Sequence, residues 1–227
     1  MSQDTQTEPD LQAKILPVTP FQQNTTLLWS RRTLEGVFID PGGEVPRLVA
    51  EAGQHGVKIV AVWLTHGHLD HAGGATGVAR HFGVDIIGPH ADDQWLLDDI
   101  VRQWASYGQT EGYENCVPTR YLQDGDMLEL AGHVFDVVHC PGHTPGHVAI
   151  INRTHRIAFV GDLLFQGSIG RTDFPRGNFD QLVDSITGKL WPYGDEIAFV
   201  PGHGPMSTFG RERKTNPFVS DLALGRA

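Results

Sequence analysis

Apolar positions along the chain recur with two different spacings, and each spacing predicts one type of secondary structure. In the first half, short apolar or β-branched runs bounded by turn residues predict strands at 15–19, 25–30, 36–39, 58–65 and 84–88. Apolar residues spaced by helical turns predict helices at 44–55, 73–82 and 92–107. The strand at 58–65 is almost entirely apolar, which is typical of a strand covered on both faces.

The second half repeats this order of elements. Strands are predicted at 127–130, 133–139, 148–152, 157–160 and 197–200, and the first four of them form two hairpins. A helix is predicted at 179–189. Each half therefore has a meander of strands followed by a helix and a further strand. Two such halves predict an α/β fold in which two sheets pack face to face with helices outside.

Length and composition favour one large domain. The chain has 227 residues, and we expect a flexible N-terminal tail at 1–12 followed by a single domain at 13–227. The formal net charge of −10 argues against binding to a nucleic acid backbone. No apolar run has the length of a membrane span, and the polar, acidic start does not resemble a signal peptide. Because there are also only 2 cysteines, we expect a cytoplasmic protein.

The 12 histidines are the unusual feature of the composition, because five of them follow predicted strands together with two aspartates. These residues are His66, His68, Asp70, His71, His143, Asp162 and His203. The first four lie in one loop after the strand at 58–65, and glycine at 67 lets that loop bring them to one point. Imidazole and carboxylate groups together suit zinc, iron or manganese. Such a cluster is costly to bury without a cation, so the sequence predicts a metal site.

The pattern His-x-His-x-Asp-His at 66–71, with the downstream histidines and aspartate, resembles the motif of the metallo-β-lactamase superfamily. The resemblance extends from about residue 14 onward and implies a four-layer αβ/βα sandwich. It implies a first metal ion on His66, His68 and His143, a second on Asp70, His71 and His203, and Asp162 as the bridge between them. We expect two divalent metal ions, with zinc as the metal and iron or manganese as alternatives.

A second motif, Gly170-Arg171-Thr172-Asp173-Phe174, follows Asp162 and resembles a segment of the glyoxalase II enzymes. In that family a lysine at this position binds the glycine carboxylate of glutathione, and Arg171 matches it. A guanidinium also binds a carboxylate well, through two parallel hydrogen bonds. The chain ends about 24 residues after His203, without the C-terminal helical domain of the classical enzymes. This short form, with Phe21-Gln22-Gln23-Asn24, Asp40-Pro41-Gly42-Gly43, the segment at 170–174 and the tail at 204–208, resembles the short bacterial glyoxalase II-like hydrolases of the YcbL type.

This resemblance implies a hydroxyacylglutathione hydrolase, which is a metal-dependent hydrolase of glutathione thioesters. The nucleophile would be a hydroxide that bridges the two metals, so no serine or cysteine nucleophile is needed. Asp70 would bind metal and also orient this hydroxide as the catalytic carboxylate. Arg171 would bind a carboxylate of the substrate. The expected partner is a small-molecule glutathione thioester, with no nucleic acid or membrane involved.

Two other functions remain open at this point. Persulfide dioxygenases share the Gly-Arg-Thr-Asp segment and use a single iron held by residues that match His66, His143 and Asp162. A non-catalytic metal-binding scaffold is the third interpretation. The metal, the acyl group and the oligomeric state also stay open. So do the roles of Cys140, as a packed or a reactive thiol, of His147, as support for the site or as the start of a strand, and of the basic segment at 211–218.

Overall fold

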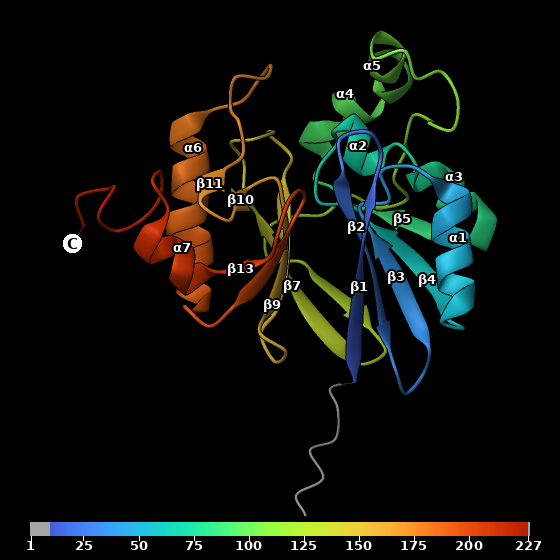
Figure 1. The fold of residues 1–227 in the computed structure, drawn as a ribbon, viewed down its shortest axis with the longest axis horizontal. Helices are drawn as coiled ribbons and strands as arrows, with labels where there is room; N and C mark the ends of the chain where they lie inside the picture. Colours follow the sequence, from blue (N-terminus) through green and yellow to red (C-terminus); the bar gives the residue numbers. More distant parts are fainter. Residues whose placement is uncertain (1–9, 227) are drawn as a thin grey trace, which may run out of the picture.

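Two mixed β-sheets lie face to face between two outer layers of helices (Figure 1). The computed structural model describes residues 10–226, and its architecture is the predicted four-layer αβ/βα sandwich. In spatial order, the first sheet consists of β1 (Leu11–Val18), β2 (Gln23–Ser30), β3 (Glu35–Ile39), β4 (Lys58–Trp63) and β5 (Asp85–Ile87). The second sheet consists of β13 (Ser207–Thr208), β12 (Ala198–Pro201), β9 (Ile157–Gly161), β8 (Val148–Asn152), β7 (His133–His139) and β6 (Met127–Leu130). A separate ribbon pairs β10 (Leu164–Phe165) with β11 (Ser168–Ile169).

The helices divide between the two halves. Those of the first half are α1 (Val45–Gln54), α2 (Leu69–Ala72), α3 (Ala75–Phe82), η1 (Ala91–Asp93), α4 (Gln94–Leu97) and α5 (Ile100–Ser106). Those of the second half are α6 (Phe179–Asp184), η2 (Ser185–Leu190), η3 (Trp191–Tyr193) and α7 (Phe209–Thr215). Helices α1 and α3 cover the outer face of the first sheet, and α6 and α7 cover that of the second (Figure 1).

Three apolar clusters fill the three spaces between the four layers. Val62 of β4 packs with Leu48 of α1 in the cluster under the first helical layer. The next residue, Trp63, points to the opposite face and meets Phe135 of β7 edge-on, with ring centroids 5.2 Å apart, between the sheets. Leu182 of α6 belongs to the third cluster, against the second sheet. The alternation on β4 explains why its sequence is apolar from Ile59 to Trp63.

The predicted strands and hairpins are confirmed. Strands β6 and β7 pair antiparallel through a two-residue turn, in which Ala131 and Gly132 have φ angles of 51° and 86°. Such positive angles give the turn the twist of a hairpin. Strands β8 and β9 form the second predicted hairpin. The parallel pairings of β3 with β4 and of β9 with β12 connect the meander in each half to the strand that follows a helix.

The prediction of one continuous helix at 92–107 is wrong, because the chain breaks between α4 and α5. In an unbroken helix the N–H of Val101 would donate to the carbonyl of Leu97. Instead Val101 N donates to Asn115 Oδ1 over 2.9 Å, and Leu97 O accepts from Cys116 N over 3.1 Å. The Asn115 side chain also donates to Asp98 O over 2.5 Å. A distant segment thus takes over the bonds that would have continued the helix.

Other boundaries differ by smaller amounts. The region expected to be one helix at 73–82 is α3, with α2 just before it, and the region at 179–189 begins as α6 and continues as the π-helical turn η2. Leu11 and Gln12 of the expected tail belong to β1, whereas residues 1–9 lie outside the described part of the chain. In the described residues no helix has the length and apolar character needed to cross a bilayer.

Candidate metal centre

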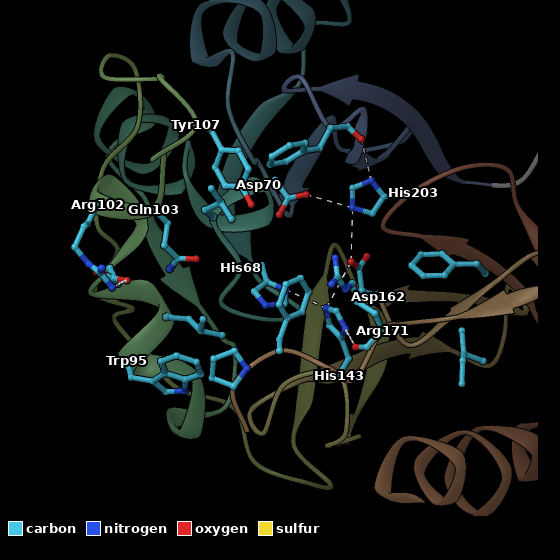
Figure 2. A pocket seen from close by; sticks show the side chains of 18 of the residues that line it. His68, Asp70, Trp95, Arg102, Gln103, Tyr107, His143, Asp162, Arg171 and His203 are labelled. Carbon is cyan, nitrogen blue, oxygen red and sulfur yellow. Dashed lines mark hydrogen bonds and ion pairs between the residues drawn. The ribbon is translucent and has the colours of Figure 1, made fainter. Parts of the chain in front are cut away.

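Four loops from both halves of the fold meet at one end of the two sheets (Figure 2). The loop after β4 carries His66 and His68, whereas Asp70 and His71 belong to the short helix α2 that follows it. The expectation that all four lie in one loop is therefore only partly correct. The loops after β7, β9 and β12 carry His143, Asp162 and His203. Because β4 belongs to the first sheet and the other three strands to the second, the site lies between the two halves. All seven predicted residues come together there.

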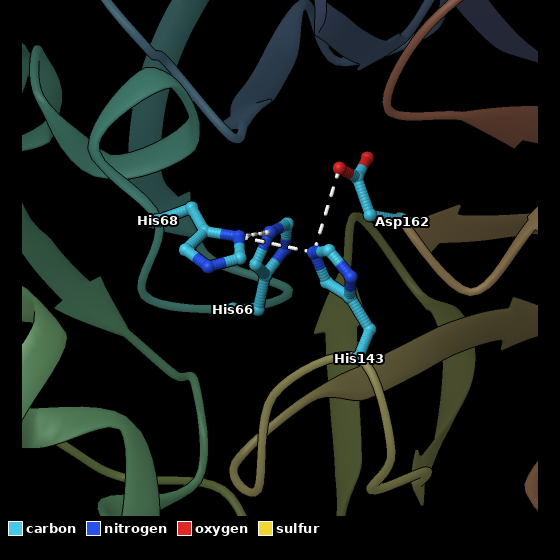
Figure 3. A group of neighbouring side chains, drawn as sticks. All are labelled: His66, His68, His143 and Asp162. Carbon is cyan, nitrogen blue, oxygen red and sulfur yellow. Dashed lines mark hydrogen bonds and ion pairs between the residues drawn. The ribbon is translucent and has the colours of Figure 1, made fainter. Parts of the chain in front are cut away.

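Three of the histidines form a first group with Asp162 (Figure 3). Nδ1 of His68 lies 3.1 Å from Nε2 of His66 and 3.0 Å from Nε2 of His143. Nε2 of His143 lies 3.6 Å from Oδ2 of Asp162. All four side chains are buried. Their ligand atoms converge on one point, as the resemblance implies for the first metal ion.

Asp70, His71 and His203 form a second group next to the first. Nε2 of His203 lies 3.2 Å from Oδ2 of Asp70 and 3.6 Å from Oδ2 of Asp162. Nε2 of His71 lies 3.3 Å from Oδ1 of Asp162. The Asp162 carboxylate therefore faces both groups, which is the position that a bridging ligand requires. The ligand role of each residue stays a prediction.

The buried nitrogen and oxygen atoms of these residues are chemically suited to bind divalent metal ions. In each group the candidate ligand atoms lie within 4.8 Å of one another. His71 Nε2 and Asp162 Oδ1 are buried and make no hydrogen bond to any described group. A buried polar atom without a partner is costly, and a cation between them would satisfy both. Imidazole and carboxylate ligands suit zinc, iron and manganese, so the structure leaves the identity of the metal open.

The protonation states of two imidazoles in the first group also fit a metal ion. Burial, together with repulsion from His143, lowers the pKa of His68 to about 3. Burial and the neighbouring His71 lower the pKa of His66 well below its ordinary value. Both rings are therefore neutral at pH 7, and a neutral imidazole is the form that binds metal.

The carboxylates favour positive charge in the second group. Burial raises the pKa of Asp162, but attraction to His71 outweighs it and leaves the pKa below the usual range. The same balance of burial against His71 lowers the pKa of Asp70. In turn, burial lowers the pKa of His71, but Asp162 and Asp70 outweigh this effect and hold it well above its usual value. A metal ion would supply the positive charge that these groups attract.

Asp40 fixes the orientation of His71. Its Oδ2 lies 2.9 Å from His71 Nδ1, and its two oxygens also accept from the backbone N–H and the hydroxyl of Thr65 over 2.7 and 2.6 Å. A carboxylate on the outer nitrogen of a metal-binding imidazole holds the ring in one tautomer and orientation. The sequence indicates a turn at this residue but gives no sign of the contact, which spans 31 positions.

Asp93 joins the two histidine loops, a role that the sequence pattern does not indicate. Its buried carboxylate accepts from Gly67 N over 2.9 Å, from Gly146 N over 2.6 Å and from Thr144 Oγ1 over 2.7 Å. Burial raises its pKa to about 6, although these three donors act in the opposite direction. Gly67 lies between His66 and His68, and Thr144 follows His143. One side chain therefore connects the loops that carry candidate ligands from the two halves.

His143 and His147 complete the support of the first group. Nδ1 of His143 donates to the backbone carbonyl of Arg171 over 2.7 Å, which leaves Nε2 for a metal. His147 is buried, and its Nε2 accepts from the backbone N–H of Asp162 over 3.1 Å. Its ring stacks on that of His66 with centroids 4.5 Å apart. His147 therefore supports the site, in addition to preceding β8.

A cavity of about 670 Å³ opens over the two groups (Figure 2). One wall comes from α4 and α5 and carries Trp95, Arg102 and Tyr107. The opposite wall comes from the loop after β11 and carries Arg171 and Phe174. The pocket is thus lined with aromatic and basic side chains around a buried cluster of histidines and aspartates. It suits a small anionic or zwitterionic molecule with apolar parts.

Arg171 lies at the mouth of this pocket. Its Nε and Nη2 donate to Asp173, each over 2.7 Å, and its guanidinium lies 4.2 Å from the centre of the Phe174 ring. The side chain is 62% exposed, so it is open to a ligand in the pocket. Its role as a substrate contact stays a prediction.

The two cysteines are packed thiols. Both are buried and unpaired, and burial raises the pKa of each to about 12. Cys140 belongs to the cluster between the second sheet and its helices. Since a thiolate is the reactive form of cysteine, neither thiol suits the role of nucleophile. The basic segment at 211–218 is mostly α7, which begins at Phe209 and lies on the outer helical layer (Figure 1).

Comparison with known proteins gives consistent matches over nearly the whole chain. The family model described as the metallo-beta-lactamase superfamily matches residues 18–203. Hydroxyacylglutathione hydrolase GloC of Haemophilus influenzae is 43% identical over 208 residues, which cover 91% of this chain and 97% of that protein. The probable metallo-hydrolase YqgX of Bacillus subtilis is 31% identical, with coverage of 92% and 98%.

Solved structures agree with these matches. The B3 metallo-beta-lactamase BLEG-1 is 32% identical with a TM-score of 0.84, and the match covers 92% of this chain and 99% of that chain. TTHA1623, solved in a di-iron-bound form, is 34% identical with a TM-score of 0.81 and coverage of 90% and 99%. The di-iron form is consistent with the view that a scaffold of this kind accepts metals other than zinc.

Proposed function

The chain belongs to the metallo-beta-lactamase superfamily, and from this premise we propose that it hydrolyses glutathione thioesters, as a hydroxyacylglutathione hydrolase. The coarser assignment is a metal-dependent hydrolase, which follows from the family and from the cluster of histidines and aspartates. The likeness to GloC over nearly the full length of both chains carries the finer assignment. The pocket supports it, because a basic group at its mouth suits the carboxylates of glutathione.

The reaction needs an activated water and a polarised thioester carbonyl, and two divalent metal ions held by the cluster would supply both. We assign Asp70 the role of orienting the attacking water, because its carboxylate lines the pocket in the second group. Asp93 and Asp40 would hold the ligand loops in place while the substrate enters. Neither described cysteine is suited to attack the thioester, which is consistent with a water nucleophile.

Arg171 is the proposed contact for a carboxylate of the substrate. Its bonds to Asp173 use Nε and Nη2, so the two N–H groups on Nη1 are not part of that pair. The pair with Asp173 and the stack on Phe174 would hold the guanidinium at the mouth before the substrate arrives. The small-molecule partner and the cytoplasmic location expected from the sequence stay predictions, as does the assignment of a single domain at 13–227.

The test of this function is a panel of thioesters, with the metal content measured on the same sample. We expect two metal ions per chain and hydrolysis of S-D-lactoylglutathione without oxygen consumption. Asp70→Asn should lower kcat by about a hundredfold or more while circular dichroism stays unchanged. The exposed Asp92→Asn is the matched control and should keep the wild-type rate.

Two outcomes would contradict the proposal. A protein that holds one iron and consumes oxygen with glutathione persulfide would be a persulfide dioxygenase instead. A metal-loaded protein with no activity on either class of substrate would support the scaffold interpretation.

A further inference from the structure

A second arginine–aspartate pair lies in the pocket, on the wall opposite Arg171 (Figure 2). Arg102 of α5 donates from Nε and Nη2 to the two oxygens of Asp99, over 2.5 and 2.6 Å. Arg171 and Asp173 form the same bidentate arrangement. Arg102 and Arg171 are the two basic residues of the arginine or lysine type among the described residues that line the pocket. The metal-site residues His68 and His143 lie between them in the view of Figure 2.

We propose that the Arg102–Asp99 pair binds the free amino acid end of the γ-glutamyl group of glutathione thioesters. This inference rests on the proposed function and deepens it. Arg102 binds the α-carboxylate, and Asp99 binds the α-ammonium group. Arg171 binds the glycine carboxylate at the other end of the tripeptide.

The chemistry of the ligand matches the layout of the pocket. Glutathione carries its sulfur on the central residue, and its two charged ends extend in different directions from it. The reacting thioester must lie at the metal cluster, so the two ends must reach opposite walls. A positive group next to a negative group is the complement of an amino acid zwitterion. A polyanion such as the pyrophosphate of a coenzyme A thioester would instead meet the carboxylates of both pairs.

The backbone that carries Asp99 is anchored, while the Arg102–Asp99 pair itself contributes little to the stability of the fold. Asp99 lies at the break between α4 and α5, where the Asn115 side chain bonds to Asp98 O and Val101 N. This anchor sets the place of Asp99 in the pocket wall. The Arg102 side chain is 83% exposed, and an exposed pair of this kind contributes little to stability. The guanidinium still has the two N–H groups of Nη1 outside the pair, and these are open to a carboxylate.

The test compares three D-lactoyl thioesters with the zinc-loaded enzyme. The carriers are glutathione, γ-glutamylcysteine, which lacks glycine, and N-acetylcysteinylglycine, which lacks the γ-glutamyl group. Arg102→Gln should raise KM about tenfold for the two carriers with a γ-glutamyl group, with kcat nearly unchanged. It should leave KM for N-acetylcysteinylglycine at the wild-type value. Asp99→Asn should show the same selectivity.

Two further variants serve as controls. Arg171→Gln should show the opposite pattern, with KM raised only for the carriers that contain glycine. Arg80→Gln removes an exposed arginine that pairs with Glu114 outside this pocket, and it should change none of the three values.

The outcomes separate the two proposals. If Arg102→Gln changes KM equally for all three carriers, or for none, the pair does not recognise the γ-glutamyl end, although the thioesterase function stands. If the metal-loaded wild-type enzyme hydrolyses none of the thioesters, the proposed function is wrong and this inference fails with it.

Discussion

Asp93 shows how one carboxylate can control a site without belonging to its ligands. Its oxygens accept three hydrogen bonds, from Gly67, Thr144 and Gly146, and these residues lie next to histidines from both halves of the fold. The Asp93 side chain is fully buried, so water cannot replace a lost bond. We therefore expect Asp93 to contribute both to the stability of the protein and to the affinity of the site for metal.

We expect Asp93→Asn to weaken both. An amide offers one oxygen as an acceptor, and its NH₂ group would face one of the three donors. The free energy of unfolding should fall by about 2–3 kcal/mol, and metal affinity should fall by about tenfold to a hundredfold. Denaturant unfolding and competition with a chromogenic chelator measure the two effects. The neighbouring, exposed Asp92 provides the control for stability, since Asp92→Asn leaves the three hydrogen bonds of Asp93 in place.

The thiols provide a second prediction for single residues. Burial raises the pKa of Cys116 and of Cys140 to about 12, far above the usual value of a thiol. The folded protein should therefore not react with a thiol reagent between pH 7 and pH 9, and unfolding in denaturant should release two reactive thiols per chain. Rapid reaction of one thiol in the native protein would show that Cys140 is accessible near the site.

The seven residues of the cluster were predictable from the sequence as candidate ligands, whereas the residues that orient them were not. Four of the seven lie within six positions, and the others follow recognisable strands. Asp93, in contrast, contacts residues that are 26 to 53 positions away. His143 donates to the backbone carbonyl of Arg171, and because every residue has such a carbonyl, the sequence cannot indicate this bond. Contacts of these kinds arise only when the loops are folded together.

At the scale of secondary-structure elements, glycines let the strand ends approach the cluster. A Cβ atom at Gly202, which follows β12, would lie 2.0 Å from Asp162 Oδ1 and 2.5 Å from His71 Cε1. No real side chain tolerates such distances. The loop or the ligands would have to shift, and a metal site needs its ligand atoms within a few tenths of an ångström of their places.

Gly202→Ala should therefore abolish tight metal binding and lower the melting temperature. Metal analysis after dialysis and a thermal melt give the two readouts. Gly53→Ala is the matched control, because a Cβ at this exposed position of α1 has nothing within 4 Å. Alanine is also the better helix former, so this variant should gain about 0.5–1 kcal/mol and keep its metal. Normal metal content in Gly202→Ala would mean that the loop after β12 adapts more easily than the distances suggest.

The order of the elements followed from the apolar pattern, but helix continuity did not. The residues at 92–107 have helical spacing throughout, and nothing local breaks the pattern. The break arises because Asn115 and Cys116, from a loop further along the chain, form the bonds to Val101 and Leu97. Sequence pattern reports local preference, and here a tertiary contact overrides it.

At the scale of the whole molecule, the site connects two halves that each have a core of their own. The clusters under the two helical layers contain residues of one half each, and the third cluster joins the sheets. Direct bonds also cross between the halves near the site, such as Asn24 N to Gly202 O over 2.7 Å and Val148 N to Thr65 O over 2.8 Å. The protein should therefore fold without metal. Ligands from both halves would nevertheless make a bound metal an additional connection between them.

Metal removal should accordingly lower stability without unfolding the protein at room temperature. A metal ion present at a thousand times its dissociation constant stabilises the folded state by about 4 kcal/mol. For a chain of this size that corresponds to a melting temperature roughly 10 °C higher. Treatment with a chelator should reverse this shift, and added zinc, iron or manganese should restore it. The size of the restored shift should rank the three metals by affinity. His66→Ala removes a ligand of the first group, so its melting temperature should respond much less to the chelator. An equal response in this variant would mean that the stabilising ion binds elsewhere.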